Sequence, residues 1–140
     1  MTFRNCIRFL LIMTIGCYST LPSYSQEIHV KASIDTNQIL IGDWIHLDLE
    51  IEHSKNVNIK WPIIADSIGH FEIVEQSPKT INQTEKDITE KITYIITCFD
   101  SGYYVIPPFI FTYKKDQDTA NSTTETEAAL IIVNSIPVDM

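Results

Sequence analysis

The sequence predicts an all-β protein, an antiparallel immunoglobulin-like β-sandwich of seven or eight strands preceded by a signal peptide. Apolar and polar residues alternate along most of the chain after residue 27, which is the period of half-buried strands. Polar, turn-forming clusters separate the strand-length runs. No stretch beyond the N-terminal segment carries a convincing helical period, so parallel sheets, which need crossover connections, are not expected.

Residues 1–25 have the organisation of a secretory signal peptide. Arg4 and Arg8 precede an apolar run that is too short to span a bilayer, for which about 20 residues are needed. Small residues occupy the −3 and −1 positions if cleavage falls between Ser25 and Gln26. Lipid attachment at Cys17 is the alternative, but it fits the expected pattern less well. We therefore expect an exported protein, periplasmic or secreted.

The remaining chain predicts one domain, residues 26–135, followed by a tail or linker at 136–140. Of 140 residues, 44% are hydrophobic, which is enough to form the core of a single domain. Without the signal peptide, eight lysines remain against 18 acidic residues, a net charge of −10. Such a surface repels phosphate backbones and anionic lipids, so nucleic acid and membrane surfaces are not expected as partners.

Two long runs define the first predicted strands, 27–35 and 44–52, and each places every second residue on an apolar face. Further runs are rich in β-branched and aromatic residues, namely 57–61, 71–75, 89–99, 103–106, 109–113 and 128–134. The polar clusters between them are expected to be loops, namely 53–56, 76–83 and 114–127.

The stretch FDSGYYVIPPF, residues 99–109, predicts a structural corner. Asp100, Gly102 and Tyr104 have the spacing of a tyrosine corner, in which the phenol hydroxyl bonds to an upstream backbone group at the start of the sixth strand. Asp100 is expected to cap the turn, and Gly102 to adopt a conformation that other residues avoid. Pro107 and Pro108 cannot donate to a ladder, so the strand must break there before resuming at Phe109.

No catalytic, cofactor-binding or metal-binding grouping is evident. Cys98 is the only cysteine after residue 25, so no internal disulfide can form, and we expect it to be buried and inert. The four histidines are scattered on polar faces or in loops, where we expect them to be exposed. Residues 116–127 resemble a calcium loop only in part, since the glycine is missing at its sixth position. Neither an enzyme nor a small-molecule substrate is expected.

Two aromatic residues are candidate contact residues. Trp44 lies on the phase of its strand that otherwise faces water, and Tyr103 is not needed for the corner. Trp61 is expected to belong to the core. The alternative function is a carbohydrate-binding sandwich. In that case Trp44, Tyr103 and Phe99 would have to form its aromatic platform.

The chain resembles the N-terminal β-sandwich domain of BatD-type proteins, the aerotolerance-associated envelope proteins found especially in Bacteroidetes. The resemblance is carried by VKASIDTNQILIGDWIHLDLEIE, WPIIADSIGHFEIVE and FDSGYYVIPPFIFTY, with VNSIPVD after them, and covers nearly all of residues 28–139. It implies an exported, non-enzymatic module that binds other envelope proteins, including proteins with von Willebrand A-type domains, in an oxidative-stress context. Membrane attachment is expected only through partners or a further C-terminal region.

Overall fold

The computed structural model describes residues 28–138. The predicted signal peptide, with Cys17, Ser25 and Gln26, lies outside these residues. Within them no helix is long and apolar enough to cross a membrane. The strands are β1 (His29–Ile34), β2 (Gln38–Leu40), β3 (Trp44–Ser54), β4 (Val57–Lys60), β5 (Ser67–Ile68), β6 (Phe71–Gln76), β7 (Thr80–Gln83), β8 (Asp87–Thr97), β9 (Gly102–Ile106), β10 (Ile110–Lys115), β11 (Ser122–Glu125) and β12 (Ala129–Asn134).

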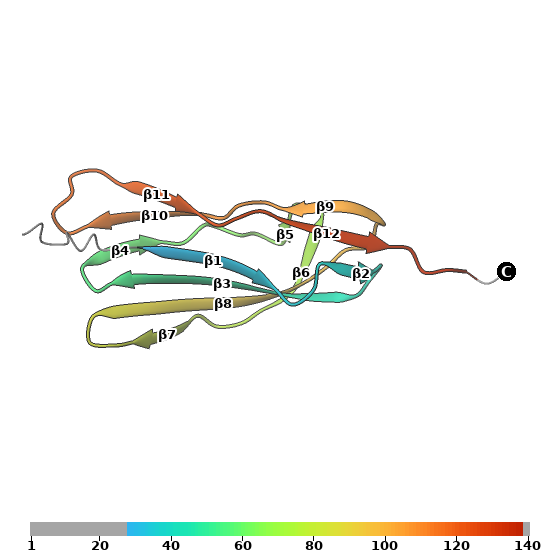
Figure 1. Cartoon of the computed structure of the whole chain (residues 1–140), viewed down its shortest axis with the longest axis horizontal. Coiled ribbons are helices and arrows are strands. Elements are labelled where there is room, and N and C mark those ends of the chain that lie inside the picture. Colours follow the sequence, from blue (N-terminus) through green and yellow to red (C-terminus); the bar gives the residue numbers. More distant parts are fainter. Residues whose placement is uncertain (1–27, 139–140) are drawn as a thin grey trace, which may run out of the picture.

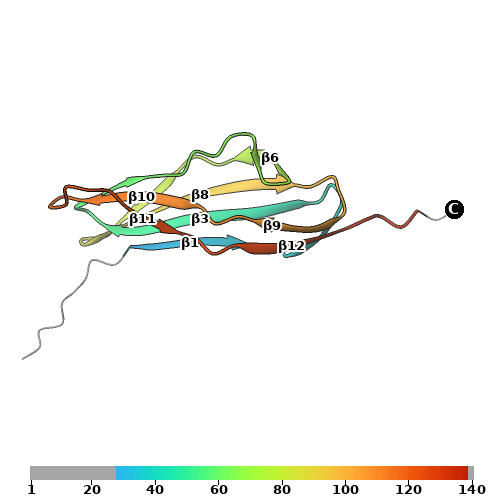
Figure 2. The same ribbon diagram turned by 90° about the horizontal axis from the view of Figure 1, so that it is seen from above.

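The strands form a two-layered sandwich (Figure 1). One layer is a single sheet in which β1, β3, β8, β6 and β5 follow one another and β7 also pairs with β8. The second layer consists of two three-stranded sheets in line, one ordered β11-β10-β4 and the other β2-β12-β9. Viewed from above, strands of both layers run along the same long axis (Figure 2). The all-β sandwich predicted from the sequence is therefore confirmed.

Several short segments join into longer strands, so the observed pattern resembles the seven or eight strands predicted from the sequence. β6 and β7 both pair with β8. β9 and β10 flank Pro107 and Pro108, and β12 pairs with β9 while β11 pairs with β10. Read this way, the first layer has the order of the A, B, E and D strands of an immunoglobulin-like fold, and the second that of its G, F and C strands.

The structure corrects the prediction in two respects. β7 and β11 lie within 76–83 and 114–127, which we expected to be loops. Their side chains are mostly polar and partly or fully exposed, so no apolar alternation marks them, and only hydrogen bonding to β8 and β10 makes them strands. The pairing is also not wholly antiparallel, because β2 runs parallel to β12. These two strands come from opposite ends of the domain, so no crossover helix is needed.

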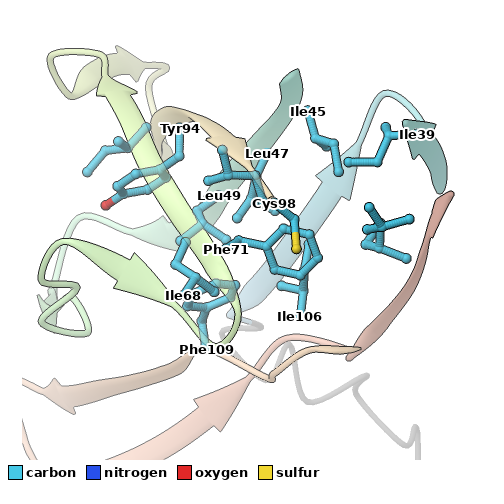
Figure 3. Packing of buried hydrophobic residues seen from close by; sticks show 14 of the residues in the cluster. Ile39, Ile45, Leu47, Leu49, Ile68, Phe71, Tyr94, Cys98, Ile106 and Phe109 are labelled. Atoms are coloured by element: carbon cyan, nitrogen blue, oxygen red, sulfur yellow. The ribbon is translucent and has the colours of Figure 1, made fainter. Parts of the chain in front are cut away.

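The core lies between the layers and is built from the inward phase of each long strand. Ile45, Leu47, Leu49 and Ile51 of β3 are fully buried, as the alternation predicts. Figure 3 shows part of this cluster, with Cys98 and Phe71 side by side near its centre. Cys98 is 1% exposed, so its predicted burial is confirmed. Trp61 is only partly buried and packs edge-on against Phe111, with ring centroids 4.9 Å apart.

Candidate protein-interaction face

Tyr104 forms the corner between β8 and β9. Its hydroxyl donates to the carbonyl oxygen of Ser101 at 3.2 Å, and its ring packs against His70 and edge-on against Phe71. Gly102 has φ 149°, and a Cβ there would lie 3.3 Å from the Tyr104 Cζ and Oη atoms. A glycine is needed because the ring folds back over this position. Among residues 28–138 only the backbone carbonyl of Asp100 takes part in a hydrogen bond at this turn, accepting from Cys98 Sγ, so its carboxylate does not cap the turn as expected.

The Tyr104 hydrogen bond lies at the surface, so it should contribute less to the free energy of unfolding than a buried hydrogen bond would. We expect Tyr104→Phe to lower the free energy of unfolding by about 0.5 to 1 kcal/mol, the lower part of the range for one intramolecular hydrogen bond. Tyr103→Phe should leave it unchanged, since the Tyr103 side chain is 75% exposed. Urea unfolding of both variants checks this. Equal losses would show that the Tyr104 hydroxyl does not stabilise the corner.

Pro107 and Pro108 separate β9 from β10, and both are exposed. Pairing resumes at Ile110, one residue later than predicted, while Phe109 turns into the core. Thr126, in the segment between β11 and β12, forms two hydrogen bonds across this break. Its Oγ1 accepts a hydrogen bond from the Phe109 N–H at 2.9 Å, and its own N–H donates to the Phe109 carbonyl at 3.1 Å. Thr126 is 3% exposed, so this contact is shielded from water.

The two predicted contact residues are both exposed but lie on opposite layers. Trp44 is 58% exposed at the start of β3, on the outer face of the first layer, whereas Tyr103 belongs to β9 in the second layer. Because they point away from opposite sides of the sandwich, the two rings do not form one flat platform. Trp44 and Tyr103 therefore do not belong to one platform of a carbohydrate-binding surface. Phe99, the third predicted aromatic, is 58% exposed between β8 and β9.

Tyr103 instead belongs to an apolar surface that sequence reasoning missed. Along β9, β12 and β2 the inward residues Ile106, Ile131, Val133 and Ile39 are buried, so their neighbours point outward. The register pairs Tyr103 with Ile132 and Val105 with Leu130. We call this outward set the apolar face; its members are Leu40, Tyr103, Val105, Leu130 and Ile132.

The apolar face contains no charged residue. The other outward positions of these three strands are Gln38 and Asn134, which are uncharged as well. Val105 and Leu130 are both about half exposed although they lie directly opposite each other. An apolar cross-strand pair gains stability from burial on one side of a sheet, and here that side is open.

The outer face of the first layer has a different chemistry. Lys91 Nζ lies 2.8 Å from Asp48 Oδ2, and His46 Nδ1 lies 2.9 Å from Asp35 Oδ2. Hydrogen bonds from Lys91 and Thr93 hold the pKa of Asp48 below its usual value, although partial burial acts to raise it. Cross-strand charge pairs of this kind are typical of a solvated surface. The outer face of the first layer is therefore charged and solvated, whereas the apolar face on β9, β12 and β2 is uncharged.

A polar cluster also lies between the layers, at the end where β3 turns into β4. Glu90 accepts a hydrogen bond from Trp61 Nε1 at 2.7 Å, and its carboxylate lies 3.0 Å from Lys79 Nζ and 3.3 Å from His53 Nε2. His53 is only 4% exposed, which corrects our expectation of a surface histidine. Continuing the β3 alternation from Ile51 by two residues would have predicted this burial.

His29 and His46 lie on the neighbouring strands β1 and β3, and they could share a metal ion only if they were side by side. His29 pairs in register with Glu52, and His46 is bound to Asp35, so the two are not neighbours. Within residues 28–138, no group of three or more His, Cys, Asp or Glu side chains is arranged to hold a metal ion.

A comparison with protein families decides which family this sandwich represents. The family model described as the BatD DUF11 like domain matches residues 32–131. The chain belongs to the BatD family. The match runs from within β1 to the middle of β12, and so includes the tyrosine corner, the proline break and most of the apolar face of this BatD domain. A search of curated proteins found no match.

Proposed function

We propose that this BatD-type domain is an exported, non-catalytic interaction module, periplasmic or secreted, that binds other envelope proteins through the apolar face. The observation that carries the proposal is the uncharged, half-exposed set of side chains on β9, β12 and β2, on a chain whose net charge is −8. Depletion of charge and an exposed tyrosine are features of the centre of protein interfaces.

Membership of the BatD family supports the partner class. By resemblance, the partners are envelope proteins that include von Willebrand A-type domains, and the setting is aerotolerance and oxidative stress. The family is not known as enzymatic, which agrees with the non-catalytic role proposed here. No cofactor and no small-molecule substrate are part of the proposal, and membrane attachment would come through partners.

Crosslinking and affinity capture from an envelope fraction test the proposal. We expect the purified domain to retain one or more proteins, and Leu130→Lys to reduce their recovery about tenfold or more, because an ammonium would be buried in an apolar interface. Ile81→Lys is the matched control, since Ile81 is 61% exposed on β7 of the other layer. Equal recovery with both variants, or no captured protein, would reject the apolar face as the binding surface.

A further inference from the structure

A groove lies beside the proline break, separate from the apolar face. One wall is formed by residues 62–65 and 67–69, between β4 and β6, and the other by Pro107 to Ile110. Its volume is about 460 Å³, within the range of roughly 300 to 1,000 Å³ found for ligand pockets. Ile68 and Phe109 are both buried and lie next to one another at the edge of the core cluster (Figure 3). The groove therefore opens directly onto the core.

The lining is uncharged and mostly apolar. The eleven lining residues include no Asp, Glu, Lys, Arg or His. Two isoleucines stand at the rim, Ile63 at 92% exposed and Ile110 at 54% exposed. A nearly fully exposed isoleucine gains no stability from its position in the monomer. In so acidic a chain, a groove without charge suits an uncharged, apolar occupant.

The backbone of one wall is also unpaired. β4 ends its pairing with β10 at Lys60, and the next strand begins at Ser67. Among the described residues, none donates a hydrogen bond to, or accepts one from, the backbone of Ile63, Ile64 or Ala65. On the opposite wall, Pro107 and Pro108 have no N–H to offer. The gap is thus a section of the second layer that no strand of this domain fills.

We propose that this groove binds an extended, uncharged segment of a partner protein with apolar residues at alternate positions. The segment would pair with the free N–H and C=O groups of residues 63–65 and place alternate side chains between the walls, which is recognition by strand addition. Two features select this occupant: the uncharged lining favours an uncharged ligand, and the unpaired backbone favours an extended one.

Selection from a displayed library of random decapeptides tests the proposal with the full domain. We expect enrichment of uncharged peptides with alternating apolar residues. Their affinity should fall about tenfold or more on Ile63→Asp, because a carboxylate would then face an uncharged groove. Leu130→Lys, on the apolar face, should leave the affinity unchanged. Because Ile63 is nearly fully exposed, the substitution should not affect folding.

Amide hydrogen exchange separates strand addition from simple contact between side chains. We expect the selected peptide to slow exchange at Ile63, Ile64 and Ala65. No enrichment, peptides without alternation, affinity unaffected by Ile63→Asp, or unchanged exchange at these amides would each overturn the proposal. Loss of binding on Leu130→Lys instead would assign the peptides to the apolar face, which would support the proposed function while rejecting the groove.

Discussion

Thr126→Val should lower the free energy of unfolding by about 2 kcal/mol although valine has nearly the same shape as threonine. The substitution removes the oxygen that accepts the Phe109 N–H at 2.9 Å, in a position that is 3% exposed. A buried donor left without a partner costs about 1 to 3 kcal/mol. No adjacent ladder can replace the bond, because Pro107 and Pro108 end the β9 strand just before it.

Thr123→Val is the matched control for this prediction. Thr123 lies on the same β11–β12 segment but is exposed, so its substitution should change stability by no more than about 0.5 kcal/mol. Chemical denaturation of both variants measures the difference. Similar values for the two would mean that water or a local shift satisfies the Phe109 N–H, and that Thr126 does not hold the break together.

Glu90→Gln should destabilise the protein by about 2 kcal/mol at neutral pH, since it replaces the acceptor of charge-assisted hydrogen bonds. Burial acts to raise the pKa of Glu90, but hydrogen bonds from Lys79, Trp61 and His53 outweigh it and hold the pKa below its ordinary value of 4.5. A carboxyl with a lowered folded-state pKa contributes stability above its unfolded pKa, and that contribution disappears as the pH falls through the folded value.

The difference in stability between wild type and Glu90→Gln should therefore be largest well above pH 4.5 and shrink below it. Asp35 and Asp48 also have lowered pKa values, but they are present in both proteins and cancel in the comparison. Glu75→Gln is the control, because Glu75 is exposed and outside the cluster. Urea unfolding at a series of pH values measures the difference. A difference that does not vary with pH would contradict the assigned role of the charge.

The sequence predicted the long strands well because the alternation of apolar and polar residues along them matches the alternation of buried and exposed side chains. In β3 every second residue from Ile45 to Ile51 is buried, as predicted. Continuing the same alternation by two residues would have predicted the burial of His53 as well. Glu90 lies on the same inward-facing side of β8 as Ile92. A carboxylate at an inward position indicates that a polar partner lies beside it. The tyrosine at the corner could be predicted because its spacing from Gly102 is a local geometric requirement.

The parts that could not be predicted depend on neighbours distant in the chain. β7 and β11 are strands only because β8 and β10 offer them hydrogen bonds. Tyr103 was a candidate contact residue, but the apolar face around it needs Leu130 from β12 and Leu40 from β2, and only the register brings these together. The groove likewise forms between two irregular segments that no periodicity describes.

The parallel pair of β2 and β12 has a consequence for how the domain folds. Gln38 is aligned with Ile132, so the contact joins residues 94 positions apart in a chain of 140. Contacts of such long sequence separation carry a large loop-closure entropy and slow the folding of sandwiches to roughly milliseconds or seconds. Before β12 has paired with β2, Ile39 of β2 has no neighbouring strand. The sandwich can therefore close only after the chain has been synthesised as far as β12.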